Sequence, residues 1–372
     1  MNNLKLFLLS FVFCLAVGEA LARLVFGHVV VFPRYHAVAD YGDYTLRRTR
    51  PNTEFWHTSP EGSWQFRINA QGFRDDNDYA YAKPDDVLRI VTLGDSNVEG
   101  YEVEQEAAFA EVIGRYLRQR GVNAEVLNTG VSGFGTAEQV AFFESEGVRY
   151  QPDIVVLGFF ANDYEDSVKT GLFTVENDAL VETSKTHAPA TGILSVVNEV
   201  AVLRWLSENS YLYSVSMNAL WVTAKTLMAY ATDEAVKLEY AVPSEEITDY
   251  KQTLIAKLVE RLHASVEAAG AKLLVVDIPV RSNWKNAVRD NKTDGNLASS
   301  VPDELRPAFI DHSDRFFSTE ELFDDYRGVL ILHRQKGHYH ITEAAHAVIG
   351  IEVAKHILEE LGAETAALDR PD

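Results

Sequence analysis

The chain has 372 residues, of which 47% are hydrophobic and 24% charged, a composition typical of a globular protein with a large core. Its formal net charge of −21, with no Lys/Arg-rich stretch to offset it, argues against nucleic-acid binding, because phosphates would be repelled. The single cysteine, Cys14, lies in an N-terminal apolar run, which excludes disulfides and cysteine-ligated metals from the rest of the chain.

Residues 1–27 predict export as a signal peptide or signal anchor. The uninterrupted apolar stretch from Leu6 to Gly18 is typical of a signal-peptide core, and Ala20-Leu-Ala22 offers a cleavage site. Apolar character resumes afterwards, so a helix from Leu4 to Phe26 is just long enough to span a bilayer. We favour an uncleaved inner-membrane anchor with the domain facing the periplasm. A cleaved signal would instead give a secreted or cell-surface protein.

The next stretch, residues 28–86, is aromatic, polar and irregular. Only Trp64–Asn69 alternates like an exposed strand, and it leads into a turn at Gly72. We interpret this stretch as an N-terminal extension packed on the main domain.

Residues 87–361 alternate strand and helix patterns and precede a polar tail, residues 362–372. The predicted strands lie around Ile90 and at Ala124–Asn128, Pro152–Gly158 and Ala271–Pro279. The predicted helices end at Gly121 or cover Thr136–Val148, Ser244–Ala269 and Thr342–Leu361. This alternation predicts a three-layer α/β/α sandwich with a central parallel sheet.

The alternation lapses between about residues 164 and 243. Apolar runs at 193–205 and 211–230 lie in this stretch, and the second contains too many polar residues for a membrane span. We interpret it as a helical insertion that caps the carboxyl edge of the sheet. From there to Gly337, apart from the helix and strand already named, the pattern predicts loops.

One stretch, Leu88–Gly100, combines a buried strand with a tight turn and a serine, Ser96, ahead of a helical pattern. Ligands of open α/β sheets bind at the carboxyl ends of the strands, where this serine is expected. Alone, the pattern is also explained by a serine that caps a helix.

Two further loops follow strands and supply hydrogen-bond donors. Gly133 allows close approach of its backbone N–H to a substrate, and Asn162 carries a side-chain amide. With the N–H of Ser96 they would form an oxyanion hole, and His340, just before the last helix, would act as the general base. Each residue also has a structural explanation in a turn or helix cap, and we expect Asp95 and Asp163 to be structural.

These four blocks together resemble the SGNH/GDSL hydrolase superfamily. Gly94-Asp95-Ser96, Gly133, Asn162 and His340 match its Ser, Gly, Asn and His blocks, with Asn97 where the name GDSL has Leu. The N-terminal run and the segment Ile68–Arg74 are similar to a membrane-anchored bacterial branch. The resemblance implies a flavodoxin-like fold and an acyl-ester substrate, such as an O-acetylated cell-envelope polysaccharide or a lipid ester. It implies no cofactor.

One departure concerns the third member of the catalytic triad. The family's aspartate precedes the histidine by two or three residues, but His338 and Gly337 occupy those positions. Other aspartates that could orient the imidazole are Asp311, Asp314, Asp324 and Asp325. His338 is an alternative base or orienting residue, although the spacing to His346 favours His340. We expect no metal site in the histidine-rich segment Leu332–His340, because no carboxylate or cysteine lies close by in sequence.

We therefore expect a serine esterase that hydrolyses acyl esters or transfers their acyl groups. The missing aspartate motivates an alternative, a catalytically degraded, membrane-tethered glycan-binding protein of the cell envelope. A soluble cytoplasmic lipase remains a third alternative. The sequence does not indicate protein partners.

Overall fold

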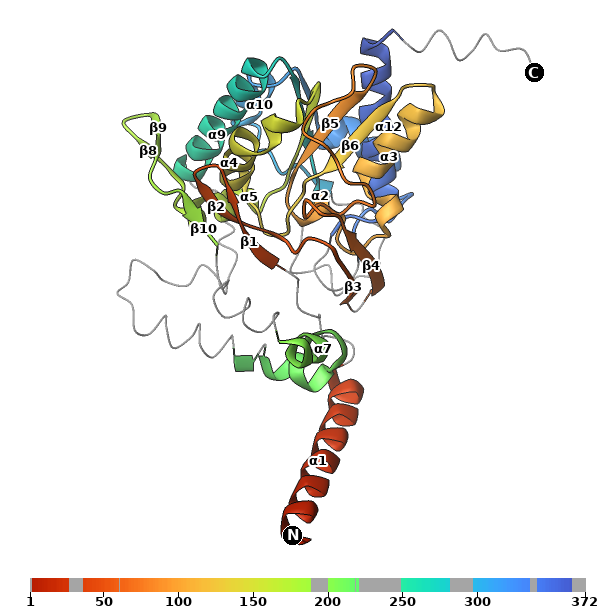
Figure 1. The fold of residues 1–372 in the computed structure, drawn as a ribbon. Helices are drawn as coiled ribbons and strands as arrows, with labels where there is room; N and C mark the ends of the chain where they lie inside the picture. The colour runs from red at the N-terminus through yellow and green to blue at the C-terminus, as the bar shows by residue number, and fades with distance from the viewer. Residues whose placement is uncertain are drawn as a thin grey trace, which may run out of the picture.

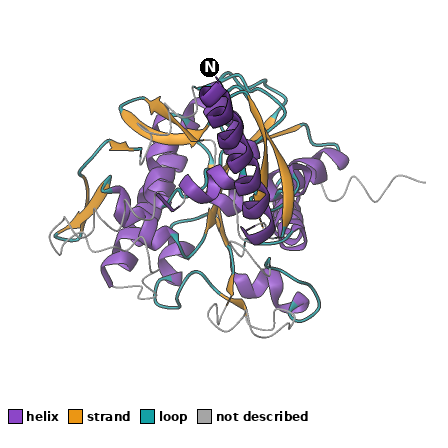
Figure 2. Ribbon diagram, turned by 90° about the horizontal axis from the view of Figure 1, so that it is seen from below, coloured by secondary structure: helices purple, strands orange, loops and turns teal. Residues whose placement is uncertain are grey.

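The computed structural model describes residues 2–26, 36–59, 61–188, 200–217, 219–220, 249–281, 297–334 and 340–362. A five-stranded sheet lies at its centre, with helices on both faces (Figures 1 and 2). The predicted three-layer α/β/α fold with a central parallel sheet is confirmed.

All strands of this sheet are parallel, in the order β14-β11-β7-β5-β6. They are β5 (Leu88–Gly94), β6 (Ala124–Asn128), β7 (Ile154–Phe159), β11 (Lys272–Asp277) and β14 (Arg315–Phe317). In chain order this arrangement is 2-1-3-4-5, the order of flavodoxin-like folds. β6 lies on one side of β5, and β7 and the later strands lie on the other, so the strand order reverses at β5. Such folds bind ligands at the carboxyl ends of the strands at this point.

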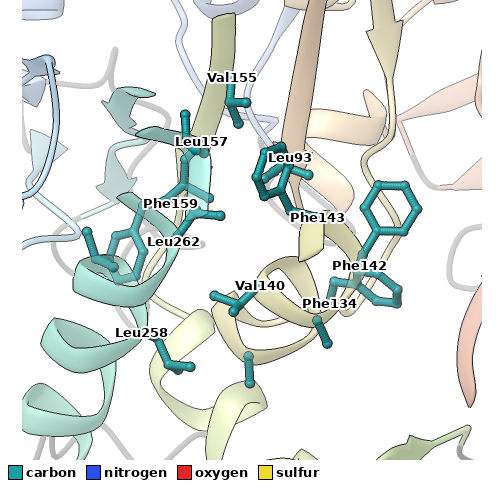
Figure 3. Close-up of a cluster of buried hydrophobic side chains, with 14 of the residues drawn as sticks. Leu93, Phe134, Val140, Phe142, Phe143, Val155, Leu157, Phe159, Leu258 and Leu262 are labelled. Carbon is teal, nitrogen blue, oxygen red and sulfur yellow. The ribbon is translucent and has the colours of Figure 1, made fainter. Parts of the chain in front are cut away.

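Successive residues of the strands face two separate hydrophobic cores. Val155 and Leu157 face one core and Ile154 and Val156 the other, as the period of a strand requires. The first core packs the sheet against α4 (Thr136–Ser145) and α9 (Asp249–Ala268) and includes Phe143 and Leu258 (Figure 3). Both faces are covered, which explains why the strands are continuously apolar.

The second core packs the sheet against α3 (Phe109–Gln119) and α12 (Glu343–Glu360). These helices and α4 match the predicted helices to within a few residues, and a 3₁₀ turn, Gly147–Tyr150, replaces the last turn predicted for α4. Residues 244–248, the predicted start of the helix before β11, lie outside the described residues. The edge strand β14 was not predicted, because three residues in a loop-rich stretch show no periodicity.

The N-terminal extension is more regular than the sequence predicts. It forms the hairpins β1 (His36–Tyr41) with β2 (Tyr44–Thr49), and β3 (Thr53–Ser59) with β4 (Gly62–Ile68). Trp64, Phe66 and Ile68 on one face of β4 are buried with Phe55 and Tyr101, so the predicted strand is exposed on its other face only.

The insertion pairs with this extension through one short strand. Helix α5 (Asp163–Thr170) precedes the hairpin β8 (Phe173–Glu176) and β9 (Ala179–Glu182), and β10 (Thr186–His187) adds to β2 in parallel. Helix α7 (Ala201–Asn209) and a helical segment at 211–217 follow. Residues 189–199 and 221–248 lie outside the described residues, so a cap over the sheet edge stays a prediction.

The remaining described elements are short, apart from the N-terminal helix α1 (Asn2–Phe26). They are α2 (Ser96–Glu99), η1 (Gln105–Ala107), β12 (Val280–Arg281), β13 (Leu297–Ala298), α10 (Arg306–Asp311), α11 (Thr319–Phe323) and η4 (Asp324–Tyr326). By length and composition, α1 is the one described helix that could cross a membrane, a property that signal sequences share.

Gly130 lets the loop after β6 pack directly on α2. A Cβ at Gly130 would lie 2.4 Å from the backbone N of Glu99, whereas one at Gly114 in α3 would meet mainly the movable end of Arg118. We predict that Gly130→Ala lowers the free energy of unfolding by about 1–3 kcal/mol, because α2 must shift. Gly114→Ala, the matched control, is neutral or stabilising through helix propensity. Urea unfolding of both variants measures the difference, and equal effects would contradict the packing.

Candidate active site

Ser96 begins a single-turn helix directly after β5. Asp95 is the N-cap of this helix, and its Oδ1 accepts a hydrogen bond from the backbone N–H of Asn97 at 2.8 Å. Ser96 is 7% exposed, so its side chain is buried rather than on the open surface. The β5–α2 turn therefore fixes one serine at the carboxyl end of the central strand.

His340 contacts this serine from the opposite end of the chain. Its Nε2 lies 2.8 Å from Ser96 Oγ. A bridge between His333 and Ile341 and a hydrogen bond from Arg334 N–H to His340 O, at 2.8 Å, hold the segment that carries the ring. The imidazole is thus placed by backbone pairing before helix α12 begins.

The second imidazole nitrogen faces a glutamate that the sequence did not single out. Glu102 Oε2 lies 3.1 Å from His340 Nδ1, and the Glu102 side chain is fully buried. With its proton on Nδ1, the ring donates to Glu102 and accepts from Ser96, the tautomer that a serine nucleophile needs. Ser96, His340 and Glu102 form one continuous hydrogen-bonded chain.

None of the four aspartates that the sequence offered as orienting groups occupies this position. Asp314 accepts from Leu273 N–H at 2.7 Å and Asp324 pairs with Arg327, while Asp311 and Asp325 are exposed. His338, the alternative base, lies outside the described residues. Glu102 was missed because we sought the acid near the histidine, whereas it follows the serine by six residues.

Gly133 lies in a loop that Glu99 ties to the serine turn. The buried Glu99 carboxylate accepts from Ser132 N–H and from Thr49 Oγ1 of the extension, each at 2.8 Å. Gly133 itself has a φ of 79°, which favours glycine, and a Cβ there would lie 2.7 Å from the guanidinium of Arg47. The N-terminal extension therefore borders the predicted oxyanion site.

Asn162 follows β7, the strand that pairs with β5. Gly94 of β5 and Gly158 of β7 are register partners, so both strands end at the same edge of the sheet. The Asn162 Nδ2 donates to Asp166 Oδ2 at 3.1 Å. The structure thus places Asn162 at the end of the strand next to the serine turn, with its amide directed to Asp166.

One of the comparisons with known proteins bears on this arrangement. The sequence model of the GDSL-like lipase/acylhydrolase family matches residues 92–237, which include Ser96, Gly133 and Asn162. No curated protein matches the chain. Residues 92–237 belong to the GDSL-like lipase/acylhydrolase family. The chain is therefore a hydrolase that acts on ester bonds.

Solved structures of a lipase/acylhydrolase and of an esterase also align with the chain at low similarity. A lipase/acylhydrolase from Enterococcus faecalis is 14% identical, covers 73% of this chain and 96% of its own, and has a TM-score of 0.37. A mutant of Axe2, an acetyl-xylooligosaccharide esterase from Geobacillus Stearmophilus, is 13% identical, covers 74% of this chain and 94% of its own, and has a TM-score of 0.39.

Buried carboxyl groups surround the GDSL serine. Burial raises the pKa of Asp95, and burial together with the neighbouring Asp95 charge raises that of Asp163. Asp163 accepts from Thr136 Oγ1 at 3.1 Å, a contact that joins α5 to α4. Asp95 thus caps α2, and Asp163 joins two helices through side-chain contacts.

His346, the second histidine of the last block, does not contact the serine. Its Nδ1 accepts from Phe109 N–H at 3.1 Å, and burial lowers its pKa to about 3. This histidine is therefore neutral at physiological pH and joins α12 to α3. Among the described residues, no group of three metal-ligating side chains lies close enough to hold a metal ion.

Arg74 holds the turn that carries Glu102. The fully buried guanidinium donates to the carbonyls of Glu99 at 3.2 Å, Val103 at 2.9 Å and Gly100, and it lies 3.7 Å from the Phe66 ring centroid. Burial lowers its pKa to about 10, so it stays charged at neutral pH.

The same turn includes an unusual backbone conformation. Glu102 has a φ of 61°, in the left-handed region that non-glycine residues rarely adopt. Arg334 donates to the Glu102 carbonyl, while Arg74 binds carbonyls on both sides of it. A strained backbone conformation persists only where surrounding contacts hold it in place, and such conformations are frequent at functional sites.

We predict that Arg74→Met destabilises the protein by about 3 kcal/mol or more, because it leaves several buried carbonyls without their donor. The matched control, Arg115→Met, removes an exposed guanidinium that binds one carbonyl, that of Glu106, and should change stability by less than about 0.5 kcal/mol. Urea midpoints measure both. A comparable shift in the two variants would show that Arg74 does not hold the turn.

Proposed function

We propose that this hydrolase uses a Ser96–His340–Glu102 triad. The observation that carries the proposal is the hydrogen-bonded chain from Ser96 Oγ to His340 Nε2, at 2.8 Å, and from His340 Nδ1 to Glu102, at 3.1 Å. A buried carboxylate on Nδ1 selects the productive tautomer and stabilises the imidazolium that forms during catalysis.

The reaction follows from these positions. Ser96 Oγ attacks the ester carbonyl carbon while its proton passes to His340 Nε2. The tetrahedral oxyanion forms near the N–H of Ser96 and that of Gly133, and Asn162 contributes when its amide turns from Asp166. His340 then protonates the leaving alkoxide, which leaves an acyl-serine. The same histidine activates water, or a hydroxyl acceptor, to release the acyl group.

We further propose that α1 remains as an uncleaved anchor that places the domain at the periplasmic face of the membrane. The apolar length of α1 supports this location. The proposed substrates are acyl esters of the envelope, an O-acetylated polysaccharide or a lipid. Product analysis separates hydrolysis from transfer, because water gives free acetate and an O-acetyltransferase gives an acetylated sugar.

The buried Glu102 removes the observation that motivated the alternative of a degraded glycan-binding protein. That alternative rested on a histidine without an acidic partner, whereas Glu102 lies in hydrogen-bond range of His340.

We predict that Ser96→Ala and His340→Ala each reduce kcat for p-nitrophenyl acetate by about 10⁴-fold or more in the detergent-solubilised full chain. Each variant removes a member of a unit that works together, so the double variant should lose little more than either single one. Additive losses would contradict a shared mechanism. The alternative of a glycan-binding protein would be favoured if the wild type turned over no acyl ester and both variants still bound glycan.

We predict that Glu102→Gln lowers kcat by about 10³–10⁴-fold with little change in KM, because the amide no longer fixes the Nδ1–H tautomer. Glu104→Gln is the matched control, since Glu104 is exposed two residues further along the chain. Steady-state kinetics on both variants test this role. Full activity of Glu102→Gln would assign the orientation of His340 to another group.

A further inference from the structure

The N-terminal helix α1 makes specific contacts with the insertion near its C-terminal end. The Glu19 carboxylate accepts from Tyr211 N–H at 3.1 Å, from Leu212 N–H at 3.0 Å and from Ser210 Oγ at 2.8 Å. These N–H groups begin the helical segment 211–217, so Glu19 caps that segment from another part of the chain.

Three further contacts complete this joint. Arg23 donates to the carbonyl of Asn209 at 2.9 Å and lies over the Tyr211 ring, 4.9 Å from its centroid. Gly18 allows close approach, because a Cβ there would lie 3.1 Å from Leu212 Cδ2. Ala22, the last residue of the Ala20-Leu-Ala22 cleavage motif, is 5% exposed. An acid in an apolar helix is costly unless paired, and here Arg23 of the same helix, whose Nε donates to Glu19 at 2.7 Å, and the insertion supply its partners.

The joint lies near the C-terminal end of α1. The span Leu4–Phe26 is 23 residues long in the sequence, which corresponds to roughly 34 Å of helix against a hydrocarbon core of about 30 Å. Glu19 lies seven residues before the end of this span, roughly 10 Å along the helix, so the Glu19–Arg23 turn lies near the membrane–water boundary when the span crosses the bilayer. The insertion segments that bind this turn lie at the same level.

These segments expose apolar side chains next to the joint. Val202 and Trp205, three residues apart on α7, are 66% and 60% exposed, and Leu220 is 67% exposed. Apolar residues on one side of a short helix, with a tryptophan among them, are typical of elements that lie in the headgroup region.

We propose that residues 200–217 form a membrane-surface element, docked on α1 through Glu19, that inserts Val202 and Trp205 into the headgroup region of the bilayer holding α1. This proposal rests on α1 being retained as an anchor, which is part of the proposed function. It does not depend on the esterase mechanism.

The test uses the full chain in vesicles of phosphatidylethanolamine and phosphatidylglycerol, in a Cys14→Ser background without other cysteines. A polarity-sensitive fluorophore is attached at Val202→Cys or at Val38→Cys, a matched control at a valine 40% exposed on β1. We expect spin-labelled lipids with the label high on the acyl chain to quench the fluorophore at 202 several-fold more strongly than at 38. Equal quenching would overturn the proposal.

The joint is tested by Glu19→Ala in the Val202→Cys chain, where we expect quenching to fall toward the control value. Unchanged quenching would overturn docking through Glu19. The intact mass of the purified wild type should retain Ala22, and cleavage after that residue would overturn the proposal. Ester turnover, followed in the same vesicles, reports separately on the proposed function, because its loss with quenching preserved would affect only the triad.

Discussion

The site depends on one turn, residues 95–103, which carries both the serine and the acid at opposite sides of a histidine from the far end of the chain. Asp95 caps the short helix that presents Ser96, and buried Glu99 binds the loop of Gly133. Glu102 is held in a left-handed backbone conformation by guanidinium contacts to the surrounding carbonyls. Backbone strain and buried charge are therefore concentrated in the turn that carries the proposed nucleophile.

The N-terminal extension is part of this arrangement. Arg74 and Thr49 reach the turn from the extension, and Arg47 borders Gly133. The Ile68–Arg74 segment, noted in the sequence only as similar to an anchored branch of the family, thus has a physical role. This segment supplies Arg74, the buried cation that binds carbonyls of the strained turn. Residues 95–103 contain no lysine or arginine that could do so.

Sequence patterns predicted the parts of the fold that depend on local regularity. The strand Ala124–Asn128 and the final helix were predicted closely because burial imposes clear periodicity on them. The hairpins of the extension and the three-residue β14 were not predicted, because short, half-exposed strands show little hydrophobic periodicity. Glu102 was not predicted for another reason. Its contact with His340 joins residues remote in sequence, and a glutamate in a loop gives no local sign of such a partner.

In the proposed mechanism Glu102 orients His340, which activates Ser96. The most direct measurement is the rate at which a fluorophosphonate labels Ser96, because this reaction reports on the nucleophile without knowledge of the natural substrate. We predict rapid labelling of the wild type at Ser96, identified by peptide mass, and labelling slowed by at least about 10²-fold in Glu102→Gln. Equal labelling rates in the two proteins would contradict it.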